Sequence, residues 1–231
     1  MKIALCIHGL YRAHVRPDPK NLIQMMKSAF PTADVYYHTW TERINDVPEQ
    51  YRDQLFSCNQ PRLNYHPIID TPDINKHGKF INYKQKNLMN AKQGNASLQI
   101  LAYADLYRKI PKQYDVYIRA RWDTLISTKV DFQPFLEEAL DHPVGFMHRH
   151  RRGVPFDKPA PVDRENINDD WYGYLCDSMI MHSPKHFDPD YVDKLNREKR
   201  LWSAEWGWYQ VMSEPYGDVH NCYHGGADLA R

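Results

Sequence analysis

The sequence predicts an α/β fold in which one mixed β-sheet is flanked by helices. The first observation is a short, continuous apolar run over residues 3–7, which is typical of a strand buried on both faces, as in parallel sheets. The second is a helical repeat of apolar residues over 21–30, followed by a β-prone segment over 34–40. A strand, a helix and a strand within about forty residues form the repeating unit of a Rossmann-like sheet.

The next part of the chain, residues 41–94, shows a weaker pattern because prolines interrupt it. A short strand over residues 66–70 is the one element that we expect there. A long helix is predicted over residues 97–109, with Asp105 the polar exception on its apolar face. Ile110-Pro111 ends this helix, because a proline disfavours helical backbone in the residue before it.

The second half of the chain contains shorter elements. Residues 114–126 are predicted to form a strand that carries three charged side chains near its carboxyl end, Arg119, Arg121 and Asp123. Further strands are expected over residues 144–147 and 177–182, and helices over 135–140, 190–200 and 204–213. Residues 148–171 form a polar loop of a length that is usually functional or mobile. Without repeats or a linker, residues 1–231 are predicted to form a single domain.

The charge balance argues against duplex nucleic acid as the main partner. Lys and Arg total 30 and Asp and Glu total 29, which gives a net charge of +1, whereas a protein that grips many phosphates usually shows a basic excess. The short basic run His148-Arg-His-Arg-Arg152 does not alter this balance.

The cysteines and the apolar runs predict the compartment. The four cysteines are far apart and include no C-x-x-C pair, so we expect reduced thiols, with neither a disulfide framework nor a zinc site. No apolar stretch approaches the roughly 20 residues of a membrane span, and the run over 3–7 is too short for a signal-peptide core. A reducing cytoplasm is therefore expected.

Ligands of open α/β sheets bind beyond the carboxyl ends of the strands, and three places there carry candidate residues. The first is His8-Gly-Leu-Tyr-Arg12, at the end of the first strand. His8 lies at the strand exit, Gly9 permits close approach of the backbone to a ligand, and Arg12 can clamp a phosphate. A tight turn with a surface arginine is the structural alternative.

The second place is Arg119-Ala-Arg-Trp-Asp123. Charges this dense at a strand end are costly unless they are paired or face a cleft. A leaving diphosphate needs its negative charge neutralised, which arginine achieves by bidentate contacts and a carboxylate by holding a divalent metal ion. Strand alternation puts Arg119, Arg121 and Asp123 on one face, which favours a shared role. An Arg–Asp ion pair that closes the sheet edge is the structural alternative.

The third place is Trp202-Ser-Ala-Glu-Trp-Gly-Trp208, where Glu205 precedes or opens a helix among three indoles. An acid beside apolar rings suits proton abstraction from an acceptor hydroxyl, and a carboxylate that binds the backbone donors of the helix is the alternative. Asp177 starts a predicted strand and is a candidate for holding a sugar hydroxyl or for capping a turn. His220 and His224 have a spacing that suits metal ligation on a helix, although the glycines that follow favour a loop.

The order of these landmarks resembles a group of bacterial and viral glycosyltransferase-like proteins of lipopolysaccharide and capsule biosynthesis, related to the WavE type. The resemblance rests on a strand that runs into Gly-x-x-Arg (residues 2–12), on Asp-Val-(aromatic)-x-His-Thr-Trp (34–40), and on Tyr-Asp-x-x-Ile-Arg-x-Arg-x-Asp (114–123). Asp177 and Glu205 follow in the expected order.

The resemblance implies a GT-A-like fold and a cytoplasmic enzyme (in the host cytoplasm if the source is viral). Such an enzyme moves a sugar from a nucleotide-sugar donor to an acceptor hydroxyl on a glycan or another molecule, usually with Mn²⁺ or Mg²⁺. In GT-A enzymes an Asp-x-Asp triplet at a strand end holds the metal ion and the diphosphate. The corresponding triplet here is Arg121-Trp122-Asp123, so the first carboxylate is missing and Arg121 is a candidate to replace part of the metal's charge.

The expected site follows from these residues. The donor diphosphate is expected at Asp123 and at the guanidiniums of Arg12, Arg119 or Arg121, with the nucleoside against His8 and Gly9. Asp123 and His224 are the candidate metal ligands, and Glu205 and Asp177 the candidate bases; the loop over 148–171 would close over the donor. A sugar nucleotidyltransferase and a non-catalytic carbohydrate- or nucleotide-binding protein stay open as alternatives.

Overall fold

The computed structural model describes residues 1–12, 14, 17–61, 95–147, 155–162, 175–198, 200–201, 204–217 and 219–230. The strand expected over 66–70 and most of the loop expected over 148–171 lie outside these residues. The strands are β1 Ile3–His8, β2 Asp34–Trp40, β3 Leu55–Cys58, β4 Val116–Arg121, β5 Thr124–Ile126, β6 Val144–Met147, β7 Ala160–Pro161, β8 Met179–His182, β9 Asn221–His224 and β10 Ala227–Leu229. The α-helices are α1 Pro19–Ala29, α3 Asn95–Lys109, α4 Gln133–Glu138, α5 Pro189–Arg197 and α6 Ala204–Met212, and the short 3-10 helices are η1 Thr41–Asp46, η2 Glu49–Gln54, η4 Pro184–His186 and η5 Glu214–Tyr216.

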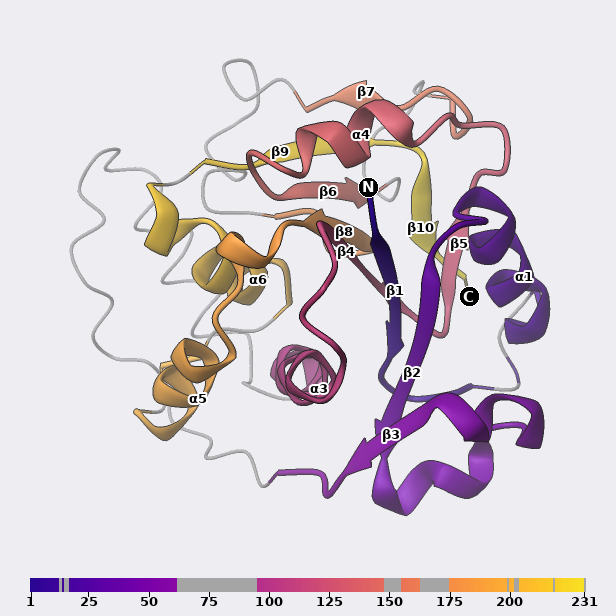
Figure 1. Ribbon diagram of the computed structural model, residues 1–231, viewed down its shortest axis with the longest axis vertical. Helices are drawn as coiled ribbons and strands as arrows, with labels where there is room; N and C mark the ends of the chain where they lie inside the picture. The colour runs from indigo at the N-terminus through magenta and orange to yellow at the C-terminus, as the bar shows by residue number, and fades with distance from the viewer. Residues whose placement is uncertain are drawn as a thin grey trace.

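Eight strands form one mixed sheet in the order β3-β2-β1-β4-β8-β6-β9-β7, which confirms the predicted fold class (Figure 1). The first four strands are parallel, and β8 is antiparallel to both of its neighbours. The chain runs from β1 outward to β2 and β3 and then returns to place β4 on the other side of β1. The sheet therefore has a topological switch point between β1 and β4, where open α/β sheets bind their ligands.

Helices cover both faces of the sheet: α1 lies on one side, and α3, α5 and α6 lie on the other (Figure 1). The continuous apolar sequence of β1 explains this arrangement. Ile3, Leu5 and Ile7 pack with the α1 side, whereas Ala4 and Cys6 pack with the α3 side. Successive side chains of a strand point to opposite faces. A strand that is covered by helices on both faces must therefore be apolar at nearly every position.

The two helices that follow an Asp-Pro pair begin in the same way. The side chain of Asp18 accepts a hydrogen bond from the backbone N–H of Lys20 (2.8 Å), and Pro19 occupies the first turn of α1. Asp188 does the same for Asp190 at the start of α5 (2.9 Å). An N-cap carboxylate satisfies a backbone donor that has no partner within the helix, and proline fits the first turn, where its missing N–H costs nothing.

Two of the sequence-based expectations need correction. The strand expected over 114–126 is broken: β4 ends at Arg121, residues 122 and 123 form a turn, and β5 pairs with β10 in a separate two-stranded sheet. The tail around His224 is β9, because Gly225 (φ 98°) and Gly226 (φ 76°) turn the chain only after that strand. Positive φ angles are nearly free for glycine, so the pair marks the turn between β9 and β10.

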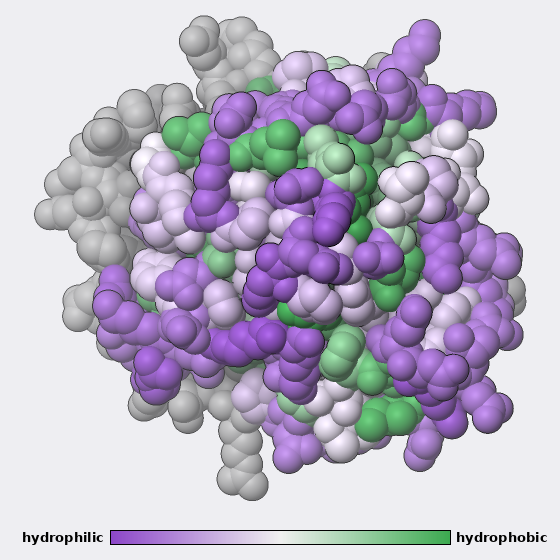
Figure 2. All heavy atoms as spheres, in the orientation of Figure 1, coloured by the Kyte–Doolittle hydropathy of each residue, from purple (hydrophilic) through white to green (hydrophobic). Residues whose placement is uncertain are grey.

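Hydrophilic side chains predominate on the face shown in Figure 2, and hydrophobic ones lie between them singly or in small groups. Among the described residues, no helix has both the length and the apolar character that a membrane span requires.

Candidate functional site

The loops that leave β1 and β4 meet at the switch point. The ring of Tyr11, after β1, packs edge-on against the ring of Trp122, after β4, with 5.4 Å between the centroids. Next to this pair, Nη1 of Arg12 lies 3.8 Å from Oδ2 of Asp123. The register of β1 and β4 explains why these loops meet. His8 is the partner of Arg121, so the two strands end at the same level of the sheet.

Gly9 opens the loop that follows β1. Its φ of 97° lies in the region that only glycine adopts readily, and a Cβ added there would meet no heavy atom within 4 Å. There is thus free space beside the backbone where β1 ends. The Arg12 side chain is 46% exposed.

Asp123 is buried in an ion pair with Arg121. Nε of Arg121 donates to Oδ1 and Nη2 donates to Oδ2, both at 2.8 Å, and the side chain of Asp123 is only 5% exposed. Bidentate pairs of this kind are the strongest and most rigid of the charged hydrogen bonds. With Arg12 beside the same carboxylate, two guanidiniums surround one negative charge, which leaves an excess of one positive charge at the end of β4.

Thr124 connects this turn to the antiparallel strand β8. Its hydroxyl accepts from the backbone N–H of Arg121 (2.8 Å) and donates to the carbonyl of Ser178 (3.0 Å). The segment that carries Asp177 is therefore held beside the end of β4. No local pattern indicated this role, because a threonine in a β-prone run is ordinary.

Arg119 lies in the core and donates all of its hydrogen bonds to protein groups. Nε donates to Nε2 of His8 (2.8 Å), Nη1 to the carbonyl of Asp177 and Nη2 to Oε1 of Gln99. The guanidinium also stacks over the ring of Trp208, 4.4 Å from the centroid. Burial lowers the pKa of Arg119 to about 9, because removing water penalises the charged form.

His8 is neutral and accepts from Arg119. A guanidinium only donates, so Nε2 of His8 must carry no proton and the proton resides on Nδ1. Burial, followed by the charge of Arg119, holds the pKa of His8 well below its usual range. Nδ1 is buried and has no hydrogen-bond partner among the described residues.

Asp177 lies just before β8 and is 4% exposed. Its Oδ2 accepts from Nε2 of Gln99 (3.3 Å), whereas Oδ1 is buried without a hydrogen-bond partner in the described part of the chain. Gln99 thus joins Asp177 to Arg119 from helix α3, a role that the apolar pattern of that helix did not indicate. An unpartnered carboxylate oxygen is costly in a protein interior and is a common feature of functional sites.

The third candidate region is only partly described. Glu205 belongs to the first turn of α6, and its side chain lies outside the described residues. Trp208, one turn later, lies against Arg119 and against the ring of His8 (6.3 Å between centroids). Helix α6 therefore packs over the buried polar groups beneath the switch point.

The two expected metal ligands, Asp123 and His224, do not come together in the described structure. Both side-chain oxygens of Asp123 accept from Arg121, and His224 lies on β9, three strands away from β4 in the sheet. Neither residue belongs to the one cluster of three or more His, Cys, Asp or Glu ligands that the described residues contain. A cation at Asp123 would therefore have to share that carboxylate with a bidentate guanidinium.

Comparison with known proteins identifies the fold. No family model and no curated protein matches the sequence. A putative glucose-1-phosphate thymidylyltransferase from Bacillus anthracis has a similar structure, with a TM-score of 0.51 and 11% identity over 97% of this chain and 88% of that one. For 4-diphosphocytidyl-2C-methyl-D-erythritol synthase from Anaerococcus prevotii the TM-score is 0.50, with 10% identity over 97% and 87%. The chain shares the mixed α/β fold of these two proteins.

Another bacterial protein, with a lower TM-score, is also among the similar structures. The S. aureus TarS fragment 1–349 has a TM-score of 0.42 and 13% identity over 97% of this chain. This chain spans 60% of the length of that fragment. Identities this low establish the fold alone, and membership of the WavE-type family stays a prediction.

Proposed function

We propose that this chain is a glycosyltransferase that binds the diphosphate of a nucleotide-sugar at the carboxyl ends of β1 and β4. The observation that carries the proposal is the meeting of Arg12, Arg121 and Asp123 beside the open backbone at Gly9. These groups lie at the topological switch point, and they present an excess positive charge next to free space. An anion with several oxygens suits such a site.

In this proposal the two arginines share the diphosphate, and Asp123 orients them. A departing nucleoside diphosphate gains negative charge, which a preorganised guanidinium stabilises without reorganisation of water. Gly9 allows the nucleoside to approach the backbone, because no side chain occupies that place. Arg119 and His8 lie beneath the diphosphate-binding arginines. They position these residues and do not bind the ligand, since their own hydrogen bonds are directed into the protein.

Asp177 is the acceptor-binding group that the geometry supports best. One of its oxygens has no partner in the described structure, and its segment is hydrogen-bonded to Thr124 at the end of β4. In an inverting reaction that oxygen would take the proton of the acceptor hydroxyl, and in a retaining reaction it would only hold the acceptor. Glu205 stays the alternative base.

The proposal assigns no step to a divalent cation at Asp123. The usual contribution of Mn²⁺ or Mg²⁺ to such a reaction is neutralisation of the leaving diphosphate. Here Arg12 and Arg121 supply positive charge at the same place, so we expect nucleotide binding to persist without added metal. A single-domain organisation over residues 1–231 and a cytoplasmic location remain part of the proposal.

A sugar nucleotidyltransferase is the second candidate. Two of the similar structures, with TM-scores of 0.51 and 0.50, are named as a thymidylyltransferase and a diphosphocytidyl-methylerythritol synthase. The segment His8-Gly-Leu-Tyr-Arg12 has one glycine and no lysine, whereas nucleotidyltransferases generally place a Gly-rich loop with a lysine there. Release of nucleoside diphosphate from a nucleotide-sugar supports the glycosyltransferase, whereas release of pyrophosphate from a nucleoside triphosphate and a sugar phosphate supports the alternative.

Nucleotide-sugar binding without turnover across many acceptors would support a non-catalytic binding protein.

The test is a thermal-shift screen with UDP, GDP, ADP and CMP, each with and without Mn²⁺. We expect one of these nucleotides to raise the melting temperature of the wild-type protein in both conditions. Arg12→Gln should weaken binding of that nucleotide by roughly ten- to hundredfold, because a charged hydrogen bond is lost.

Arg43→Gln is the matched control. Arg43 is an exposed arginine (57% of the side chain) that pairs with Asp46 on η1. This variant should bind the nucleotide as the wild type does. Equal affinity in the Arg12 and Arg43 variants, or a shift that requires Mn²⁺, would contradict the proposed arrangement.

A further inference from the structure

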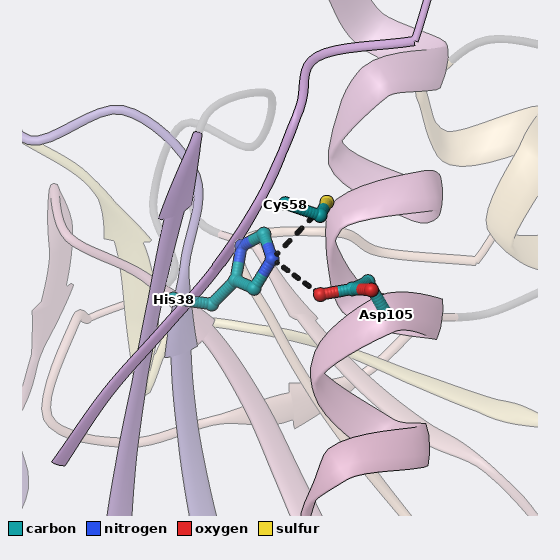
Figure 3. A group of neighbouring side chains, drawn as sticks. All are labelled: His38, Cys58 and Asp105. Atoms are coloured by element: carbon teal, nitrogen blue, oxygen red, sulfur yellow. Dashed lines mark hydrogen bonds and ion pairs between the residues drawn. The ribbon is translucent and has the colours of Figure 1, made fainter. Parts of the chain in front are cut away.

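Three potential metal ligands from three different elements meet at the outer part of the parallel sheet, beside β3. His38 belongs to β2, Cys58 ends β3, and Asp105 lies on α3; Figure 3 shows the three side chains directed toward one another. Nε2 of His38 lies 3.0 Å from Oδ2 of Asp105 and 3.6 Å from Sγ of Cys58. The three ligand atoms all lie within 4.8 Å of one another.

These distances match the edges of a zinc coordination tetrahedron. With Zn–N at about 2.1 Å, Zn–S at about 2.3 Å and tetrahedral angles, the nitrogen and sulfur ligands are about 3.6 Å apart. The corresponding nitrogen–oxygen edge is about 3.3 Å. The observed 3.6 Å for Cys58 equals the first value, and the observed 3.0 Å for Asp105 requires a movement of a few tenths of an ångström.

The sheet and α3 hold the three ligands in place. His38 pairs with Phe56 and Trp40 pairs with Cys58 in the parallel ladder, so His38 and Cys58 are diagonal neighbours on the face that α3 covers. His38 is fully buried, and its backbone carbonyl accepts from the indole N–H of Trp122 (3.0 Å). A metal site built on strands and a helix is better preorganised than one built on loops.

The ammonium group of Lys109 lies beside Asp105, where a bound metal ion would place its positive charge. This ammonium lies 2.7 Å from Oδ2 of Asp105 and also donates to the carbonyl of Ser57 (2.8 Å). The side chain is 36% exposed, so it can turn into solvent when another cation binds Asp105. Lys109 therefore competes with a metal ion and does not block it permanently.

We propose that His38, Cys58 and Asp105 bind one Zn²⁺ ion, with water as the fourth ligand. The thiolate and the imidazole select zinc over Mg²⁺ and Mn²⁺, which prefer oxygen ligands. On binding, the Cys58 thiol loses its proton to solvent and the Lys109 ammonium leaves Asp105. The ion joins the short strand β3 to α3, and its role is to stabilise this part of the sheet.

The first experiment uses the wild-type protein after removal of metal with a chelator. We expect one Zn²⁺ per chain in competition with a chromophoric zinc indicator, and a raised melting temperature without any nucleotide. Replacement of Zn²⁺ by Co²⁺ should produce the near-ultraviolet charge-transfer band of a cobalt-bound thiolate. Absence of stoichiometric binding, or cobalt binding without that band, would overturn the proposal.

The second experiment uses variants. Cys58→Ser and Asp105→Asn should each weaken Zn²⁺ binding by at least roughly tenfold, in line with the loss of a ligand. Lys109→Met should strengthen it, because the competing ammonium is removed while Asp105 stays. Asp46→Asn, an exposed carboxylate on η1, is the control and should bind as the wild type does.

If a variant that lacks a ligand fails to fold, Lys109→Met still tests the proposal. The side chain of Lys109 is partly exposed, so we expect this variant to fold. Unchanged or weaker Zn²⁺ binding by Lys109→Met would count against ligation by Asp105. The zinc readouts use no nucleotide, so they are independent of the proposed transferase activity.

Discussion

Arg119 and Arg121 differ by two positions in the sequence and have different surroundings in the structure. Arg121 is 23% exposed and pairs with Asp123, whereas Arg119 is fully buried among His8, Gln99 and the carbonyl of Asp177. Alternation in β4 gives both side chains the same face, whereas Asp123, which was expected on that face too, lies in the turn after the strand. Only Arg121 reaches the end of the strand, where its side chain is partly exposed.

Replacing Arg119 tests its positioning role. Arg119→Met should lower the free energy of unfolding by about 2–4 kcal/mol, because three buried acceptors lose their donor and Asp177 loses a nearby positive charge. Arg200→Met removes an arginine that is 49% exposed and pairs with Glu198, and should change stability by less than about 0.5 kcal/mol. Urea unfolding measures both changes, and equal values for the two variants would contradict the role assigned to Arg119.

Helix α1 depends on its first residues. Asp18→Ala removes the carboxylate that accepts from the backbone N–H of Lys20, and should cost about 1 kcal/mol of stability. Ser28→Ala changes an exposed position late in the same helix and should be neutral or slightly stabilising. Thermal unfolding of the two variants provides the comparison. A neutral Asp18→Ala would show that the cap contributes nothing.

Strand β6 passes close to the backbone before β8. A Cβ added at Gly145 would lie 2.5 Å from the carbonyl oxygen of Cys176 and 2.9 Å from Cδ1 of Leu175. Gly145→Ala should therefore cost about 1–3 kcal/mol, because a well-packed core must move to accept the methyl group. Gly217→Ala, where the added Cβ has free space but φ is 89°, should cost about 1 kcal/mol. A smaller loss for Gly145→Ala than for Gly217→Ala in urea unfolding would contradict this account.

The whole molecule should lose stability in mild acid, because buried histidines must stay neutral. In His182, Nδ1–H donates to the carbonyl of Ser183 (2.9 Å), so Nε2 accepts from the hydroxyl of Tyr103 (2.6 Å). Burial lowers the pKa of His182 from 6.5 to about 3. Between these values the unfolded chain binds a proton that the folded chain does not, so stability rises with pH across this window and falls on acidification.

This loss has a measurable size. Each pH unit below the unfolded pKa of His182 should cost about 1.4 kcal/mol, or about 2 kcal/mol at pH 5. The pKa of His8 is lowered in the same direction and adds to the effect. Urea unfolding at pH 7.5 and pH 5.0 provides the measurement, and His182→Asn should reduce the difference. Equal stability of the wild type at both pH values would contradict the prediction.

The sequence determined β1, α1 and β2 of the parallel half of the sheet, whereas β3 was not predicted. The apolar run of β1, the amphipathic repeat of α1 and the β-prone residues of β2 are local signals, and β2 was predicted with its exact bounds. The turn at Gly9 was also recognisable, because a glycine at a strand exit has local meaning. Such features depend on backbone preference and side-chain period, which neighbouring residues fix.

The tertiary structure decided which charges are paired and which are accessible. The sequence placed a metal ion at Asp123 as an expectation, whereas the fold gives that carboxylate to Arg121 and brings His38, Cys58 and Asp105 together from β2, β3 and α3. Asp105 on an apolar helix face was the one local signal of that cluster. The spacing of the cysteines predicted no zinc site, because ligands from separate elements leave no motif in the sequence. Contacts between distant residues follow from strand order and register, and these are properties of the packed sheet that no local pattern contains.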